Sequence, residues 1–431
     1  MSTGTVKEFS VSRGYAYYVF SLLFILYMFD FTDRYVIASL YPYIKADWGL
    51  SDTQCGLLMS TVTWAVLVLT FPISILIDRW SRKKSIGIMA TIWSLACGAC
   101  AFTTNFGQLF VARTILGAGE AGYTSGGYAM ISAYFPEEKR STMNGLWNAA
   151  YPLGAALGII IGGIIAVKLG WRYAFGLVAL PGLIIAILFF WVKDYKTVDL
   201  VKEEKRERAS TPEKMKIADI IISFVKTPSL MMTYFGYAGN IFFTVGLITW
   251  LPTYYSRMEG LAMDKAGMKA SVIMLLAVIG APLGGIITDW WRKKRLNARM
   301  SIPALSSLLT AGLMFIGFLF FEGTAQYLIL LLVGLVTPMF VPGGSAVTQD
   351  VVHPGLRAIS YSIAVITQSL LGASLAPIFI GAISDSYDLL TAFKLLPLFA
   401  LLSFVLFFIG SFYYERDLAK VEKVILEEES T

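Results

Sequence analysis

The chain alternates long apolar stretches with short polar turns. Apolar runs of about 20 residues or more, enough to cross roughly 30 Å of hydrocarbon as an α-helix, recur about 12 times between Tyr15 and Tyr414. The runs are continuous, whereas the strands of a transmembrane barrel alternate apolar and polar positions over shorter segments. We therefore predict an all-α membrane protein with about 12 transmembrane helices. The predicted helices cover residues 15–44, 51–77, 84–104, 107–134, 140–168, 172–193, 228–256, 264–290, 299–321, 325–350, 356–383 and 390–414.

Two polar turns in corresponding places of the two halves have nearly the same sequence. Residues 78–84 read Asp-Arg-Trp-Ser-Arg-Lys-Lys, and residues 289–294 read Asp-Trp-Trp-Arg-Lys-Lys. Internal duplication of this kind is typical of secondary transporters. We predict two pseudo-symmetric six-helix bundles joined by a charged cytoplasmic linker. The predicted parts are residues 1–193 for the first bundle, 194–226 for the linker, 227–414 for the second bundle and 415–431 for a cytoplasmic tail.

A second matching pair is Arg140 and Arg357, which open the fifth and eleventh predicted helices. Together with the acids and bases of the repeated turns, these arginines are candidates for a cytoplasmic gate that closes when the outer side opens. The predicted gate residues are Asp78, Arg82, Asp289, Arg140 and Arg357.

Composition and charge give the orientation and exclude several classes of function. The chain is 56% hydrophobic and 15% charged, with a mean hydropathy of +0.66. Its Lys and Arg residues gather in alternate turns, and such residues stay on the cytoplasmic side. We therefore expect both termini in the cytoplasm and the protein in the inner or plasma membrane. The basic cytoplasmic turns then account for the net charge of +6, and we expect no nucleic-acid partner.

The sequence offers little for enzymatic or metal chemistry. Its three cysteines give no disulfide framework, and one histidine cannot supply a metal site or a catalytic triad alone. No phosphate-binding loop of the Walker type is present. We expect no metal, no cofactor and no enzyme activity, and we expect a monomer driven by a gradient or by the substrate itself.

Charged residues inside the predicted helices are the main functional candidates, because a charge in hydrocarbon is costly unless it is paired or hydrated. Asp30, Asp33 and Arg34 share one face of the first helix through their i, i+3, i+4 spacing. Arg113 and Glu120 lie two turns apart on one face of the fourth helix. One hypothesis is a static salt-bridge network that fixes the two helices together. The other is a proton-binding site, in which Asp33 and Glu120 carry the proton and Arg34 or Arg113 pairs with them or with a substrate anion.

Other polar and aromatic residues are predicted to contact the substrate, with packing or membrane-interface roles as the alternative. The second half has no acid and base together at mid-helix depth, so we expect it to supply substrate contacts rather than proton chemistry. The candidates are Asp30, Tyr27, Trp147, Tyr151, Asn240, Trp250 and Gln368.

These motifs resemble the major facilitator superfamily over essentially the whole chain. The resemblance is carried by the repeated acid-and-basic turn, the spacing of Arg113, Gly117 and Gly119, and the Gly- and Pro-rich fifth helix. Within that superfamily, residues 32–34, 113–123, 249–254 and 371–385 resemble the spinster-like lipid transporters, and the anion:cation symporters of sugar acids share the first and fourth helix patterns. The resemblance implies alternating access between two bundles, with proton coupling through Asp33 and Glu120.

We therefore predict a proton-coupled symporter of a small organic anion. The alternative is a spinster-like exporter of a lysolipid or another amphipathic compound. Spinster-like proteins often carry an acid after the Leu-Gly of the eleventh helix, where this chain has Ala373.

Overall fold

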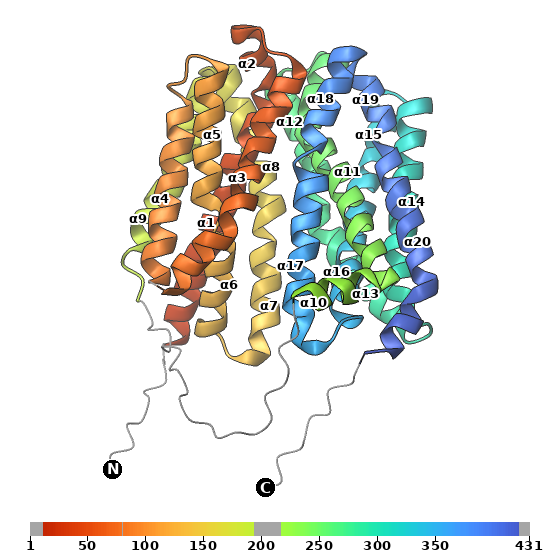
Figure 1. Ribbon diagram of the computed structural model, residues 1–431. Helices are drawn as coiled ribbons and strands as arrows, with labels where there is room; N and C mark the ends of the chain where they lie inside the picture. Colours follow the sequence, from red (N-terminus) through yellow and green to blue (C-terminus); the bar gives the residue numbers. More distant parts are fainter. Residues whose placement is uncertain (1–11, 80, 194–216, 422–431) are drawn as a thin grey trace, which may run out of the picture. The chain divides into compact units, whose positions relative to one another are not determined.

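The computed structural model describes residues 12–79, 81–193 and 217–421, and within them every regular element is helical (Figure 1). This confirms the predicted all-α fold. The charged run at 202–208 of the predicted linker lies outside the described residues.

The first half contains the helices that carry most of the predicted charged site. They are α1 (Arg13–Tyr35), η1 (Val36–Ser39), α2 (Tyr41–Trp48), α3 (Asp52–Arg79), α4 (Arg82–Cys100), α5 (Phe106–Glu120), α6 (Tyr123–Tyr134), α7 (Glu137–Asn148), α8 (Ala150–Lys168) and α9 (Trp171–Phe189).

The second half repeats this pattern of long helices with short breaks. It comprises α10 (Ile217–Val225), α11 (Pro228–Met258), α12 (Met263–Leu275), α13 (Ala277–Arg292), α14 (Ala298–Phe320), α15 (Gly323–Val336), η2 (Thr337–Met339), α16 (Phe340–Asp350), η3 (Pro354–Leu356), α17 (Arg357–Thr367), η4 (Gln368–Ala373), α18 (Ala376–Ser386), α19 (Leu389–Leu395) and α20 (Pro397–Ala419).

Among the described residues, 10 helices are long and apolar enough to cross a membrane. The two remaining predicted spans, residues 84–104 and 107–134, are also helical. The first of these is α4, which begins with three basic residues. The second is divided into α5 and α6 by a turn at Ala121 and Gly122. The chain is therefore a multi-pass membrane protein.

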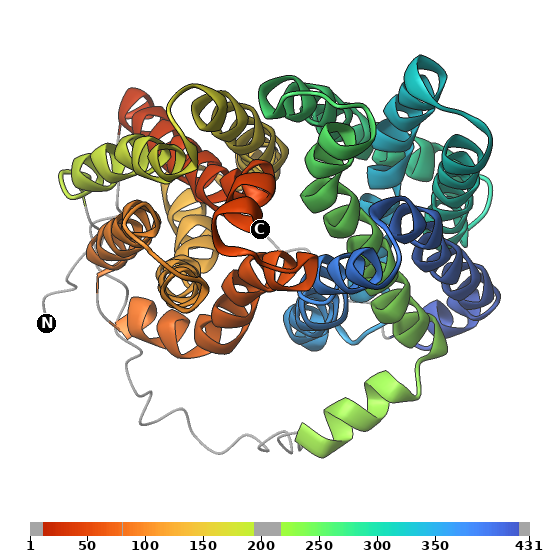
Figure 2. The same ribbon diagram turned by 90° about the horizontal axis from the view of Figure 1, so that it is seen from above.

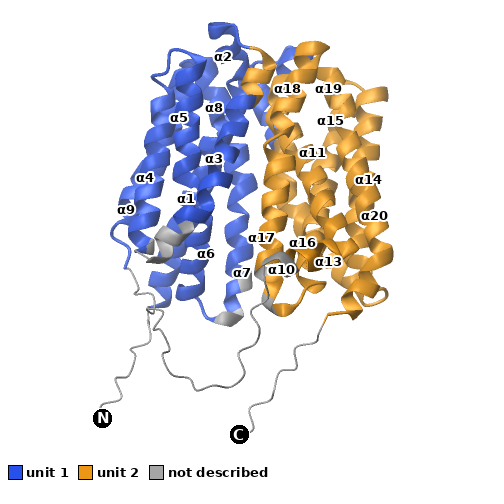
Figure 3. Ribbon diagram, in the orientation of Figure 1, with its two compact units in different colours: residues 1–50, 57–201, 255–271 blue, residues 51–56, 202–254, 272–431 orange. Residues whose placement is uncertain are grey.

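The chain divides into two compact units (Figure 3). Unit 1 comprises Met1–Leu50, Leu57–Val201 and Tyr255–Ser271, and unit 2 comprises Ser51–Gly56, Lys202–Tyr254 and Val272–Thr431. The bundle limits proposed from the sequence, residues 1–193 and 227–414, remain a prediction.

Glycines let α8 pack closely on α1 within unit 1. Gly154, Gly158 and Gly162 recur every four residues on α8 and so share one face of it. A Cβ atom at Gly158 would lie 2.5 Å from the carbonyl oxygen of Thr32, which leaves no room for any side chain. The Thr32 hydroxyl in turn donates to the carbonyl oxygen of Gly154 at 3.1 Å. The small residues of α8 thus fix the part of α1 that carries Asp30, Asp33 and Arg34.

Candidate functional site

The predicted charged residues of α1 and α5 converge inside unit 1. Asp33 and Arg113 are fully buried, and Asp30 and Glu120 are 3% and 4% exposed. The side chain of Arg34 is 17% exposed. The structure thus brings Asp30, Asp33 and Arg34 of α1 into one cluster with Arg113 and Glu120 of α5.

Arg34 and Glu120 form a buried ion pair between α1 and α5. The Nε atom of Arg34 donates to Oε2 of Glu120 at 3.1 Å, and its Nη2 atom donates to the same oxygen. The guanidinium also lies over the ring of Phe31, 5.2 Å from its centroid. Glu120 is the last residue of α5, where the helix dipole disfavours a negative charge. Arg34 therefore supplies the positive charge that holds this carboxylate at a helix end.

Arg113 donates to three backbone carbonyl groups and, more weakly, to the sulfur of Met59. Its guanidinium donates to the carbonyl oxygens of Leu58 at 3.2 Å, Asp33 at 3.1 Å and Arg34 at 2.9 Å. These last two carbonyls lie where α1 gives way to the 3₁₀ helix η1, and the final carbonyls of an α-helix lack partners within the helix. Arg113 thus caps the end of α1, while Arg34 makes the ion pair.

The Asp33 carboxylate has a different environment from that of Glu120. Among the described residues, neither of its oxygens has a hydrogen-bond partner, and one oxygen each of Asp30 and Glu120 is also without one. The thiol of Cys97 on α4 lies beside Asp33, and its sulfur is also 3.7 Å from the carbonyl oxygen of Phe175. The sequence gives no signal that places Cys97 near Asp33.

Aromatic residues cover the charged cluster along α1. The rings of Tyr27 and Trp147 stack with centroids 4.2 Å apart, and the Trp147 indole N–H donates to the carbonyl oxygen of Leu23 at 3.2 Å. The Tyr151 hydroxyl lies 3.3 Å from that of Tyr35. Trp147 is fully buried, so its position is that of a core residue, whereas Tyr151 is partly exposed.

Comparison with known proteins identifies the fold and the family. The Major Facilitator Superfamily model matches residues 23–377, which is most of the chain. The chain belongs to this superfamily. A bacterial homologue of the human lysosomal transporter spinster, solved in an inward-facing and unoccupied conformation, superposes with a TM-score of 0.82 at 21% sequence identity. The match covers 94% of this chain and 99% of the solved one. The protein is therefore a major facilitator transporter, and both resemblances predicted from the sequence are found among its relatives.

Two curated relatives represent the two branches of this resemblance. The hexuronate transporter of Bacillus subtilis (strain 168) is 28% identical over 341 residues, which cover 78% of this chain and 80% of the relative. Protein spinster homolog 1 of Xenopus laevis is 24% identical over 400 residues, covering 88% of this chain and 76% of the relative.

The substrate contacts predicted for the second half of this major facilitator chain lie in unit 2. Asn240 is 1% exposed and its amide donates to the Ser307 hydroxyl at 2.9 Å, while its carbonyl oxygen lacks a partner among the described residues. Gln368 begins the π-helical segment η4, a local geometry frequent at functional sites. Trp250 is fully buried and donates to the carbonyl oxygen of Pro377 at 3.0 Å, as a packing residue would.

The predicted gate residues are only partly described. The side chains of Asp78 and Arg82 fall outside the described part of the chain, and Asp289 is exposed. Arg140 donates from Nε to the carbonyl oxygen of Phe135 at 3.1 Å, and Arg357 donates from Nε to that of Gln349 at 3.2 Å. Each arginine thus donates to a backbone carbonyl of a preceding residue, five residues upstream for Arg140 and eight for Arg357.

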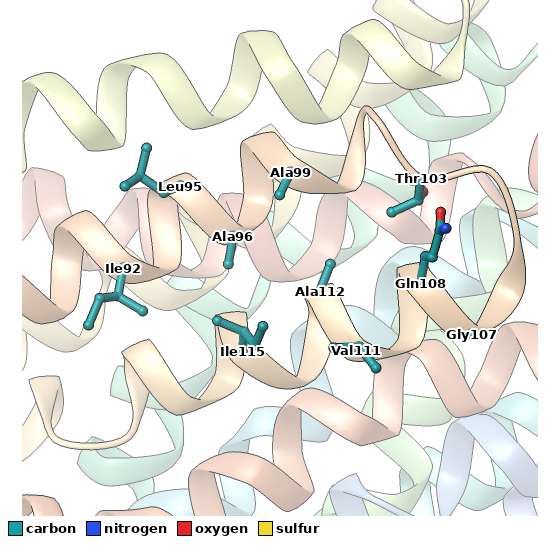
Figure 4. Close-up of a pocket in the computed structure, with 10 residues that line it drawn as sticks. All are labelled: Ile92, Leu95, Ala96, Ala99, Thr103, Gly107, Gln108, Val111, Ala112 and Ile115. Atoms are coloured by element: carbon teal, nitrogen blue, oxygen red, sulfur yellow. The ribbon is translucent and has the colours of Figure 1, made fainter.

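A groove of about 710 Å³ lies between α4 and α5, away from the charged cluster (Figure 4). Its walls are almost entirely apolar, with Thr103 and Gln108 at one end. An apolar groove without a buried charge offers no group that could bind an anion or a proton, so the charged cluster remains the candidate site.

Proposed function

We propose that this transporter is a proton-coupled symporter that imports a small organic anion by alternating access. The observation that carries the proposal is the buried cluster of unit 1, which holds three carboxylates, those of Asp30, Asp33 and Glu120. Arg34 is the cation that forms an ion pair there, because the hydrogen bonds of Arg113 go to backbone carbonyls.

The charge balance of the cluster argues for proton binding. If all side chains were ionised, three negative charges would face two positive ones inside a membrane-spanning unit, and an unbalanced charge there costs several kcal/mol. Protonation of one carboxylate removes this cost. Asp33 is the best candidate in this conformation, because it is fully buried and the group beside its carboxylate is the Cys97 thiol, a weak donor, rather than an arginine side chain. Glu120 takes up a proton when Arg34 leaves it.

Arg34 is the proposed binding group for the substrate carboxylate. Its guanidinium can hold a planar carboxylate with two parallel hydrogen bonds, and its partial exposure gives access that Arg113 lacks. The Bacillus subtilis relative, whose name assigns it to hexuronate, supports an acidic sugar as the substrate, because a hexuronate presents one carboxylate. The basic turns support an orientation with both termini in the cytoplasm.

The alternative is export of a lysolipid or another amphipathic compound, the activity that the spinster-like resemblance implies. The Xenopus laevis relative favours this reading. Ala373 weighs against it, since it occupies the position where spinster-like proteins often carry an acid.

Uptake by proteoliposomes under an imposed pH gradient tests the proposal, with radiolabelled D-glucuronate and a lysolipid as parallel probes. We expect D-glucuronate to accumulate only when the gradient is inward for protons. Asp33→Asn and Glu120→Gln should abolish gradient-driven accumulation while retaining exchange of D-glucuronate across the membrane. The matched control is Glu322→Gln, which changes an exposed acid in unit 2 and should behave like the parent protein. Unchanged coupling in both site variants would refute the proton assignment, and transport of the lysolipid alone would establish the alternative.

A further inference from the structure

Helix α10 runs in a different direction from the membrane-spanning helices of unit 2. It has nine residues, Ile217–Val225, and only Lys226 and Thr227 separate it from α11, the first spanning helix of the second half. Figure 1 shows it crosswise to the long helices of unit 2 near their lower ends, and Figure 2 shows it extending outward from the start of α11. Its connection to a spanning helix therefore places it at the membrane surface, roughly parallel to it.

Over residues 220–225, the helix places apolar side chains on both its inner and its outer face. On the inner face, Phe224 is 4% exposed and packs in the core of unit 2 with Ile220 beside it. On the outer face, Ile221, Ile222 and Val225 are about half exposed, at 52%, 47% and 60%. A surface helix in water carries polar residues on its outer face. The outer face of α10 therefore requires an apolar cover.

Cations gather where α10 meets α11. The buried carboxylate of Asp417 accepts hydrogen bonds from the backbone N–H and the hydroxyl of Ser229, at 3.1 and 2.9 Å. Its other oxygen contacts Arg416 at 3.2 Å and Lys420 at 3.4 Å, and these side chains are 53% and 60% exposed. Lys226, also exposed, lies three residues before Ser229. Arg416 and Lys420 thus share one carboxylate, and Lys226 adds a third exposed cation at the end of α10, which leaves a positive edge beside the apolar face.

We propose that α10 is an interfacial helix that inserts Ile221, Ile222 and Val225 into the lipid leaflet and binds an anionic phospholipid headgroup through its positive edge. Apolar side chains that enter the acyl boundary, together with cations at headgroup height, are the features by which in-plane helices bind acidic membranes. A phospholipid supplies both the apolar cover and the negative charge from one molecule. This inference does not depend on the transported substrate.

Fluorescence quenching in proteoliposomes tests the proposal on the full chain. A bimane label is placed at Ile222→Cys, since the three native cysteines are buried. Phosphatidylcholine or phosphatidylglycerol with brominated chains serves as the quencher. We expect both lipids to quench the label, with a preference for brominated phosphatidylglycerol of at least about fivefold, which one cation near the surface can supply. A label at Arg295→Cys, in an exposed polar turn, is the aqueous control and should be quenched by iodide instead.

The combined variant Lys226→Gln, Arg416→Gln, Lys420→Gln separates insertion of the apolar side chains from binding of the anionic headgroup. It retains the hydrogen bonds from Ser229, at the start of α11, to Asp417 on α20. It should lose the preference for phosphatidylglycerol while keeping quenching by both lipids. Equal quenching of the parent by the two lipids would overturn the anionic headgroup site. Quenching of residue 222 by iodide would overturn membrane insertion. A label reached by neither lipid nor iodide would show that another protein segment covers α10, and would overturn the proposal as well.

Discussion

The buried pair of Arg34 and Glu120 should be strongly coupled in a double-mutant cycle. Arg34→Gln leaves Glu120, whose side chain is 1% exposed, as a buried charge without its partner, which costs about 3–5 kcal/mol. Glu120→Gln leaves Arg34, which is 17% exposed and lies over Phe31, so it loses only a charged hydrogen bond of about 1.5–3 kcal/mol. The double variant removes both partners of this pair, so neither of the two is left as an unpaired charge, and it should lose about 1–2 kcal/mol. The summed losses of stability of the two single variants should therefore exceed the loss of the double variant by about 3 kcal/mol or more.

Unfolding in mixed detergent micelles, followed by helical circular dichroism, measures the free energies of the four proteins. The ion pair of Arg172 and Asp47 provides a matched control in unit 1, because its side chains are 42% and 46% exposed. The equivalent cycle there, with Arg172→Gln and Asp47→Asn, should give a coupling of about 1 kcal/mol or less. If the Arg34–Glu120 cycle were additive within about 0.5 kcal/mol, the pair would not be a desolvated ion pair and the coupling mechanism would lose its basis.

Three further predictions concern the support of the site and the fold. Arg113→Leu leaves the carbonyls of Asp33, Arg34 and Leu58 without their donor, at a cost in stability of about 3 kcal/mol or more. The yield of monodisperse protein on size exclusion should therefore fall sharply. A normal yield with lost transport would instead assign Arg113 to substrate binding. Gly158→Ala should destabilise the protein by about 1–3 kcal/mol in the same unfolding assay. Gly145→Ala is the control, because nothing lies within 4 Å of the new Cβ atom, and it should be neutral or slightly stabilising. Equal effects of the two substitutions would contradict the close approach of α8 to α1. Asp388 caps α19 by accepting from the backbone N–H of Thr391 at 2.5 Å, and hydrogen bonds from Thr391 lower the pKa of this carboxyl. The contribution of this cap is present above the unfolded carboxyl pKa of about 4 and is lost as the pH falls through the lower folded value. Asp388→Ala should lower the free energy of unfolding by about 1 kcal/mol at neutral pH. If this difference in stability between variant and parent did not shrink in acid, the carboxylate charge would not be involved.

Periodicity was sufficient to predict which charged residues share a helix face. The spacing of Asp30, Asp33 and Arg34 places them together on α1, and the structure keeps this arrangement. The lengths of the apolar runs were likewise sufficient to predict the all-α architecture. Unpaired backbone groups are costly in lipid, and a continuous apolar run can pair all of its own only as a helix. The small residues of α8 recur at a four-residue spacing that favours close helix packing, and the structure has this packing against α1.

The breaks in the helices could not be predicted, and they decide the roles of individual residues. The sequence reads 15–44 and 107–134 as continuous spans, but α1 ends at Tyr35 and α5 ends at Glu120. The first break frees the carbonyls to which Arg113 donates, and the second places Glu120 at a negative helix end. Contacts between distant helices, such as Cys97 beside Asp33, leave no local pattern in the sequence.

In the proposed cycle, one guanidinium serves two carboxylates in turn. Arg34 uses its Nε and Nη2 atoms on Glu120, and these lie on the fork that a substrate carboxylate would require. Binding of the anion therefore competes with the ion pair, and it would leave Glu120 buried and charged unless a proton arrives with the substrate. Arg113 cannot relieve this competition, because moving it would strip the end of α1 of its donors. In this cycle, proton uptake is coupled to substrate binding because Arg34 must pair either with Glu120 or with the substrate anion. A second arginine free to form ion pairs at this site would be expected to uncouple substrate binding from protonation.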